Sequence, residues 1–297
     1  MENNKAKALH YFIKEATVGE LDYILEDISN IIGNKDFINE PEIIEALRTY
    51  HETHLNHHTL PNGQEVVVSE HGRRENESKA PVEDGGEGDA SESNQGLFTY
   101  VDEARNTRFT VDVRHEDSKC KVIDDSEKHA DGAVQGFKET LVESLDKYLS
   151  ECYKAGTTRG TVSIEGSGSI TAHIEISCHN LSHKNFWGGE WLSKWAVTHT
   201  IGSTDYNLSG SIKIVNHYFE QGNIQFKLDK SFDSLSKKCA QGNVQENIFE
   251  QISNLEEKYQ GSLEEMYEEI SDNHMKNLRR KLPFTGKAFE WGVPKIL

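Results

Sequence analysis

Apolar positions recur with two different periods along the chain, and the period changes after residue 52. Between residues 5 and 52 they recur every three or four positions, which is the spacing of one helix face. Gly33-Asn34 is a typical helix end, and Pro41 is a typical helix start. We therefore predict three short helices joined by short loops, packed as a small bundle.

The rest of the chain up to residue 240 is rich in two-residue alternation, with one helical stretch at 133–153. On 170–177, Ile174 and Ile176 would share one face, and His173 and Glu175 the other. Three stretches, 65–70, 97–100 and 108–113, are predicted strands. The alternating stretches in the middle of the chain predict an antiparallel sheet with one face buried and one exposed. They are 161–164, 170–177, 191–200, 211–219 and 224–228.

A helical period returns from about residue 243 and continues to 281. A helix of that length would span over ~50 Å at 1.5 Å per residue. It should lie across a wide sheet or against a partner, because its apolar stripe needs cover along its whole length. The predicted fold class is α+β.

Four regions follow from these patterns. Residues 1–58 form the helical bundle, and 59–132 hold strands with an insertion at about 73–96. That insertion is rich in Glu, Asp, Gly and Ser and nearly free of apolar residues, so we predict that it is disordered. Residues 133–240 form a helix and the central sheet, and 241–297 form the long helix and a tail.

Composition narrows the possible partners. The net charge is -18, which disfavours nucleic acid and requires a local basic patch for any anionic partner. Four widely spaced cysteines predict no disulfide framework or zinc knuckle. There is no apolar run long enough to span a membrane, and the polar N-terminus does not resemble a signal peptide. We expect a soluble, cytoplasmic protein.

Three local patterns allow two interpretations each. The cluster His51, His54, His57 and His58 could be a zinc site or a set of polar loop histidines. Residues 166–169 resemble half of a dinucleotide loop, but a strand follows them, which favours a hairpin turn. The tryptophans at 187, 191 and 195 could line a ligand site on a helix or pack a sheet. No catalytic motif is present, so we predict that the protein is not an enzyme and needs no cofactor.

The charge of the last helix changes sign along its length. Its body is rich in Glu, and its end carries Lys276, Arg279, Arg280 and Lys281, followed by Lys287. Lys276, Arg279 and Arg280 share one helix face at this spacing. The helix dipole would account for one or two of these cations. The cluster therefore predicts a docking site for an acidic protein or a lipid headgroup.

Two stretches resemble signatures of one known family. Residues 182–195 are similar to the central signature of the F-actin capping protein alpha subunits, and 275–283 are similar to a second signature near their C-terminus. Weaker similarity covers 19–21, 70–72 and 217–225, in the same order along nearly the whole chain.

The resemblance implies a particular architecture. It predicts an N-terminal three-helix stalk, an antiparallel sheet completed by a second subunit, and a long C-terminal helix packed across the sheet. The second subunit could be a beta subunit or a second copy of this chain, since either would cover the open sheet edge.

The resemblance also implies a function. The family caps the barbed, fast-growing end of F-actin without calcium, so we expect a cytoskeletal protein that blocks subunit addition and loss. By similarity Lys276, Arg279, Arg280, Lys287 and Trp291 would contact actin. Phosphoinositides would compete at Lys276 and Arg280. The alternative is a scaffold or adaptor with the same fold and no strong capping.

The sequence departs from the family pattern at two places. Gly286 stands where the family carries an arginine, and Lys287 could replace it. Glu290-Trp291 matches the start of the family's C-terminal tail, but the sequence ends at Leu297. We therefore expect weaker capping than is usual in the family.

Overall fold

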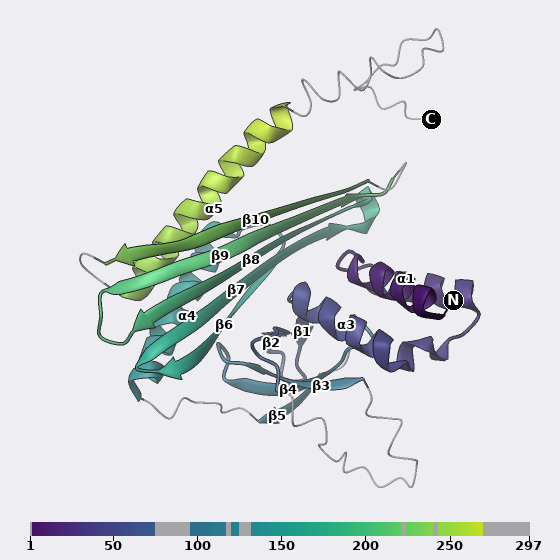
Figure 1. Ribbon diagram of the computed structural model, residues 1–297, viewed down its shortest axis with the longest axis horizontal. Helices are drawn as coiled ribbons and strands as arrows, with labels where there is room; N and C mark the ends of the chain where they lie inside the picture. The colour runs from purple at the N-terminus through teal and green to yellow at the C-terminus, as the bar shows by residue number, and fades with distance from the viewer. Residues whose placement is uncertain are drawn as a thin grey trace. The chain divides into compact units, whose positions relative to one another are not determined.

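The structure is a computed structural model that describes residues 2–74, 96–116, 120–124, 132–220, 224–239 and 243–269. The chain divides into two compact units, Met1–Phe249 and Glu250–Leu297. The first unit holds the N-terminal helices, all the strands and the start of the last helix (Figure 1).

The three predicted N-terminal helices are confirmed. They are α1 (Glu2–Lys14), α2 (Leu21–Ile32) and α3 (Pro41–Thr53), with a short 3-10 turn at Asp36–Asn39. Gly33 ends α2 in the left-handed conformation at φ 68°, where its N–H donates to Ser29 O at 2.9 Å. That conformation suits glycine because it has no Cβ.

The helices share a core with a small sheet. Strands β3 (Leu97–Asp102), β4 (Thr107–Asp112) and β5 (Lys121–Asp124) form this antiparallel sheet, and β1 (His57–Thr59) pairs with β2 (Glu65–Val67) beside it. The buried side chains of this core come from both sets of elements, among them Ile13, Leu21, Leu47, Tyr100 and Phe109. The N-terminal region is thus one packed body of helices and short strands.

A five-stranded antiparallel sheet forms the centre of the first unit. Its strand order is β10-β9-β8-β7-β6, so each strand neighbours the next one in sequence. The β6–β7 hairpin turns at Gly168 (φ 77°), and Ser167 pairs with Ser169 across it. The hairpin interpretation of residues 166–169 is therefore confirmed. The strands are β6 (Thr157–Ser167), β7 (Ser169–Ser182), β8 (Trp187–Thr200), β9 (Asp205–Tyr218) and β10 (Ile224–Lys238).

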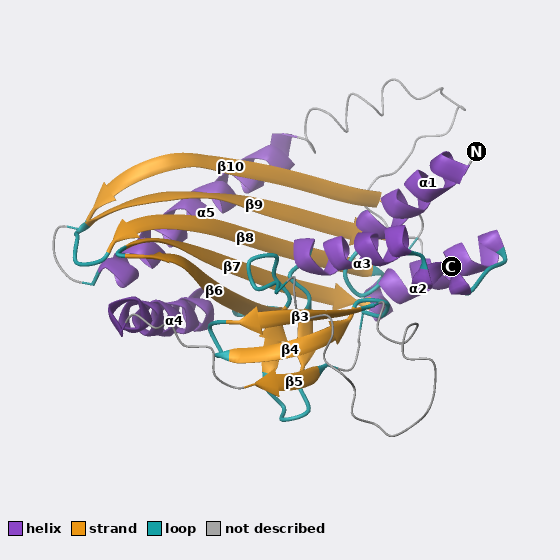
Figure 2. Ribbon diagram, turned by 60° about the horizontal axis from the view of Figure 1, so that its bottom comes forward, coloured by secondary structure: helices purple, strands orange, loops and turns teal. Residues whose placement is uncertain are grey.

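One face of this sheet is apolar and packs against α4 (Gly132–Cys152) (Figure 2). Leu145 of α4 lies so close to Gly160 of β6 that an added Cβ would approach it to 3.1 Å. Phe137 of α4 stacks on His199 with ring centroids 5.1 Å apart. All three clustered tryptophans lie on β8, and Trp195 is buried, so they pack the sheet rather than form a stripe on a helix.

The other face packs against the N-terminal body, which corrects one expectation. Alternation predicted an exposed polar face, yet Glu175, Ser177 and Glu190 are all buried. The Ser69 hydroxyl donates to Glu175, and the Ser177 hydroxyl donates to Leu55 O at 3.2 Å. Polar residues occupy this face because side chains and backbone of the N-terminal body satisfy them, as buried polar groups require.

The last helix, α5, spans Val244–Glu269. Its start is held in the first unit, because the Tyr206 hydroxyl donates to Asn247 Oδ1 at 2.7 Å and Phe249 packs on Tyr148 at 5.5 Å. The predicted continuation to residue 281 lies outside the described residues. None of the helices in the described part of the chain is long and apolar enough to cross a membrane.

The predicted acidic insertion is described only at its two ends, at Arg73, Arg74 and Gly96. Arg73 bridges to Tyr100, and the Arg74 N–H donates to Thr99 O at 3.0 Å, so both residues run along β3. Residues 75–95 lie outside the described residues.

Candidate functional site

The predicted actin-binding residues lie beyond the described part of the chain. This applies to Lys276, Arg279, Arg280, Lys287 and Trp291, and equally to the phosphoinositide assignment of Lys276 and Arg280. These assignments remain predictions.

The described residues offer a different candidate site, the open edge of the central sheet at β10. Among the described strands, β10 pairs with β9 alone, and none of its 15 residues is buried. Ile224 is 63% exposed and Leu235 is 37% exposed. An edge strand presents unpaired backbone N–H and C=O groups, so a strand from another chain can extend the sheet there.

The opposite edge of the same sheet is closed. Strands β2 and β3 of the N-terminal body contact β6, α4 packs against this strand (Figure 2), and the Arg105 side chain donates to Gly160 O. The Ile164 N–H donates to Glu103 Oε2 at 3.3 Å, and Thr161 donates to Asp102 Oδ1 at 3.0 Å. Only the β10 edge is therefore available for a partner strand among the described strands of this sheet.

The sequence of β10 suits an edge strand. Cations and anions alternate along it, at Lys227, Asp229, Lys230 and Asp233. Charges on an edge strand oppose indiscriminate strand pairing and restrict it to partners of complementary charge. The register with β9 shifts between Phe232 and Leu235, which marks a β-bulge. Next to that shift, the Phe232 ring packs on Trp195 at 5.2 Å.

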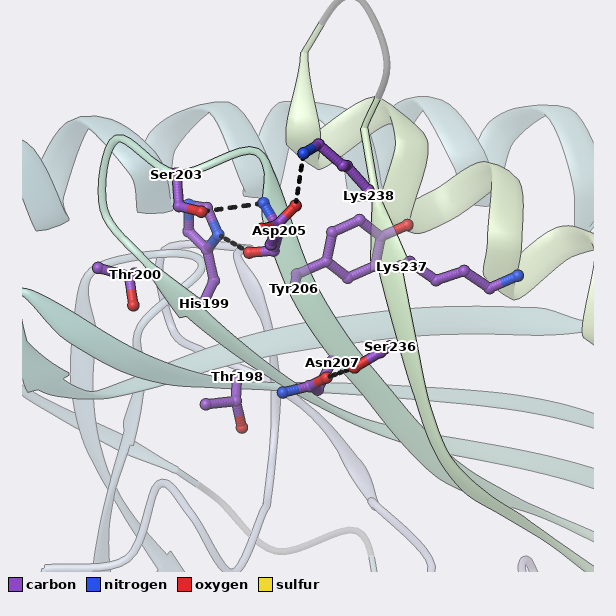
Figure 3. Close-up of a pocket in the computed structure, with 10 residues that line it drawn as sticks. All are labelled: Thr198, His199, Thr200, Ser203, Asp205, Tyr206, Asn207, Ser236, Lys237 and Lys238. Carbon is purple, nitrogen blue, oxygen red and sulfur yellow. Dashed lines mark hydrogen bonds and ion pairs between the residues drawn. The ribbon is translucent and has the colours of Figure 1, made fainter.

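A polar pocket of about 560 Å³ lies at the C-terminal end of β10 (Figure 3). Ser236 donates to Asn207 Oδ1 at 2.5 Å, which ties β10 to β9 there. Asp205 lies 3.9 Å from Lys238 Nζ, and both side chains are exposed. The pocket therefore secures the end of the edge strand and contains no buried acid–base pair. Its lining comprises Thr198, His199, Thr200, Ser203, Asp205, Tyr206, Asn207, Ser236, Lys237 and Lys238.

A layer of buried polar groups joins the sheet to the N-terminal body. Glu190 of β8 is 3% exposed, and its Oε1 lies 2.7 Å from His54 Nδ1 and 3.5 Å from His179 Nε2. Burial alone would raise the pKa of Glu190, but His54 and His179 outweigh it and hold this pKa at about 2. The carboxylate is therefore charged in the folded protein and anchors α3 to the sheet.

Two further histidines of this layer are held in the neutral form, of which His51 is buried and His57 is half-buried. His51 Nε2 lies 3.1 Å from Val113 O, and burial lowers its pKa to about 3. His57 stacks on His179 and lies 2.5 Å from Ser177 Oγ, and burial lowers its pKa to about 2. Desolvation disfavours the imidazolium in both cases.

These contacts correct the loop interpretation of the histidine cluster. His51 is buried in the last turn of α3, and His54 and His58 are also buried. The signal that could have indicated this is the helical spacing of His51 and His54 with the buried Leu47 and Tyr50.

The whole chain matches a family of known proteins. The model of the F-actin capping protein alpha subunit matches residues 9–296. The F-actin-capping protein subunit alpha of Arabidopsis thaliana is 27% identical, over 97% of this chain and 89% of that protein. The subunit alpha of Candida glabrata is 26% identical, over 98% of this chain and 94% of that protein.

A solved structure shares the fold. The homodimeric actin capping protein alpha subunit from Plasmodium berghei superimposes with a TM-score of 0.68 at 19% identity. The match covers 97% of this chain and all of that one. With an open sheet edge in the structure and a family match along nearly its full length, this chain belongs to the F-actin capping protein alpha subunit family.

Proposed function

We propose that this chain caps the barbed end of actin filaments as one subunit of a dimer whose two sheets join at β10. The observation that carries the proposal is the open β10 edge in a chain of this family. Capping would block addition and loss of actin subunits, would need no calcium, and would place the protein at the cytoskeleton. No catalytic step is part of this function.

The partner is a second chain of the same fold. A beta subunit is the first candidate, because the family name denotes one of two kinds of subunit. A second copy of this chain is the other candidate, which the homodimeric relative from Plasmodium berghei supports. A two-fold axis beside β10 would pair the strand with itself in antiparallel fashion.

The finer architecture follows from this pairing. The three N-terminal helices would form a stalk beneath the joint sheet, and the long C-terminal helix would lie across both halves. Exposed apolar side chains on α1 and α2 support a helical contact with the partner, because Tyr11, Phe12, Tyr23 and Ile31 are 56–83% exposed.

The basic end of the last helix would contact actin. Lys276, Arg279 and Arg280 concentrate positive charge on a chain of net charge -18, so an acidic partner would dock there. Lys287 and Trp291 would extend this contact. Phosphoinositide headgroups would compete at Lys276 and Arg280, because they carry the same negative charge as the acidic surface of actin.

The decisive experiment follows actin elongation from filament seeds by fluorescence. The chain is added alone, then together with a capping protein beta subunit. Slower growth with the chain alone identifies a working homodimer, and slower growth only with the partner identifies a heterodimer. Unchanged growth in both mixtures would contradict capping and favour a scaffold or adaptor with the same fold.

Two variants separate assembly from actin contact. Leu235→Asp places a third anion on the β10 edge and should convert the dimer to monomers in sedimentation, whereas Ser150→Asp on the exposed surface of α4 should not. The double variant K276E/R280E should remain dimeric but cap at least about tenfold more weakly, since charged contacts contribute at least 1.4 kcal/mol together. Full capping by a folded K276E/R280E dimer would refute this actin contact.

A further inference from the structure

Three side chains with metal-binding atoms meet on the face of the central sheet that packs against the N-terminal body. They are His71 from the turn after β2, Glu165 from β6 and His173 from β7. One nitrogen of each histidine and one carboxylate oxygen all lie within 4.8 Å of one another. Neither the β10 edge nor the basic helix end involves these residues.

The turn that carries His71 is fixed by several hydrogen bonds. The His71 N–H donates to Ser69 Oγ at 3.2 Å, and the Gly72 N–H donates to Ser69 O at 3.1 Å. The Val101 N–H donates to Gly72 O at 2.8 Å. A Cβ at Gly72 would lie 2.4 Å from Val101 O, so the turn can approach β3 this closely only with glycine. His71 is therefore held in place by its backbone.

The other two side chains are placed by the β6–β7 hairpin. His173 pairs with Ser163, and Glu165 pairs with Thr171, so Glu165 and His173 are diagonal neighbours on one face of the sheet. The His71 and His173 rings stack with centroids 3.7 Å apart and planes at 15°. Ring stacking alone would explain why the two histidines lie together. It does not explain the Glu165 carboxylate, which lies within reach of both ring nitrogens and completes a set of three metal ligands.

The neighbouring carboxylate is already engaged. Glu175 lies two residues beyond His173 on the same face, accepts the Ser69 hydroxyl, and lies 3.1 Å from Lys194 Nζ. Glu175 therefore holds the turn through Ser69, whose Oγ also accepts the His71 N–H.

The donor atoms of the three side chains decide which metal ion fits the cluster. A neutral imidazole offers its nitrogen lone pair to a metal ion, whereas an imidazolium cannot. Two nitrogens and one carboxylate oxygen favour Zn²⁺ over Ca²⁺ or Mg²⁺, which prefer oxygen ligands.

We propose that His71, Glu165 and His173 bind one Zn²⁺ ion, with water as the fourth ligand. Ligands about 2 Å from tetrahedral zinc lie roughly 3.3 Å apart, so their separations must shrink by at most about 1.5 Å. The stacked rings of His71 and His173 must also turn out of their parallel arrangement, so that both nitrogen lone pairs point at the ion. Glu165 is exposed and can make such a shift by changing its side-chain torsions. The ion would fasten the turn after β2 to the β6–β7 hairpin and so stabilise the contact between the N-terminal body and the sheet.

The test measures zinc bound to the purified full-length protein in its native assembly, with Co²⁺ as a spectroscopic substitute. We expect His71→Ala, His173→Ala and Glu165→Gln each to weaken Zn²⁺ affinity, the histidine variants by about 100-fold or more. The tetrahedral Co²⁺ absorption should be lost with them. His115→Ala is the matched control, because that side chain is 66% exposed and lies outside the cluster.

A second measurement guards against misfolded variants. Glu165 is exposed, so Glu165→Gln should keep its circular dichroism spectrum while it loses the rise in melting temperature that Zn²⁺ gives the unaltered protein. Equal zinc affinity in the three cluster variants and in the control His115→Ala would mean that histidines elsewhere on the surface bind the zinc. That result would overturn the proposal. Absence of zinc binding and of a melting shift at micromolar Zn²⁺ would also overturn it.

Discussion

Both faces of the central sheet carry buried side chains, but of different kinds. The face toward α4 is filled by side chains such as Ile174, Val197 and Leu208. The face toward the N-terminal body holds Glu175, Ser177 and Glu190, each with a hydrogen-bond partner. Apolar burial is non-directional and tolerates adjustment, whereas a polar layer depends on each donor meeting its acceptor. The first face therefore supplies stability, and the second fixes how the N-terminal body is placed.

The largest expected effect belongs to the apolar face. Leu141→Ala in α4 removes a fully buried side chain and leaves a cavity, so the free energy of unfolding should fall by about 2–5 kcal/mol. Chemical denaturation of the dimer measures this change. Glu143→Ala, at an exposed position on the same helix, should change it by less than about 0.5 kcal/mol. Equal effects of the two variants would mean that α4 does not bury this face.

A smaller effect is expected on the polar face. Glu190→Ala leaves the buried His54 and the half-buried His179 without their acceptor, which should cost about 1–3 kcal/mol. The loss should be accompanied by faster hydrogen exchange at the end of α3, because that helix loses its anchor to β8. A stability loss without local exchange at α3 would contradict the anchoring role of the carboxylate.

The smallest effect per residue is a pH dependence of the free energy of unfolding, which the histidines of the polar face cause and the apolar face does not. His51 and His57 have pKa values of about 3 and 2 in the folded protein, against about 6.5 when unfolded. The unfolded chain binds more protons below pH 6.5, so stability falls as pH falls from there toward 3. Between pH 7 and pH 5 we expect roughly 1–2 kcal/mol lost for each histidine.

The variant His57→Gln isolates this contribution. Glutamine can still hydrogen-bond to Ser177 but does not titrate. The stability lost between pH 7 and pH 5 should therefore be smaller by roughly 1–2 kcal/mol, the contribution of one histidine. Leu141→Ala should leave the pH dependence unchanged. Identical pH slopes for His57→Gln and the unaltered protein would show that the fold does not hold His57 in the neutral form.

The apolar face was predictable from the sequence, and the polar face was not. Alternation on β7 placed Ile174 and Ile176 on the buried side, as the structure has them. The same alternation assigned Glu175 to solvent, because a polar residue in a strand indicates exposure unless its hydrogen-bond partner is known. That partner, Ser69, lies 106 residues earlier in the chain. No local pattern connects the two.

The edge strand was only partly predictable. The prediction ended β10 at Leu228, because the following residues are mainly Lys, Asp and Ser, whereas the strand continues to Lys238. Those residues form a strand because β9 supplies the hydrogen bonds, and they stay polar because the side beyond β10 is open. The basic cluster at 276–280 was found from charge alone, and its role stays a prediction.

The position of β10 at the end of the strand order has a consequence for synthesis of the protein. While the chain is being made, β9 is complete before β10 exists, and its buried residues Leu208, Ile212 and Ile214 belong to the temporary edge. At ~5–20 residues per second, the chain from Tyr218 to Lys238 needs about one to four seconds to appear. During this interval a nascent chain presents an apolar edge strand without the charges of β10. The ribosome-bound intermediate from which β9 has emerged while β10 has not should therefore be the form most prone to wrong pairing and the one most in need of a chaperone.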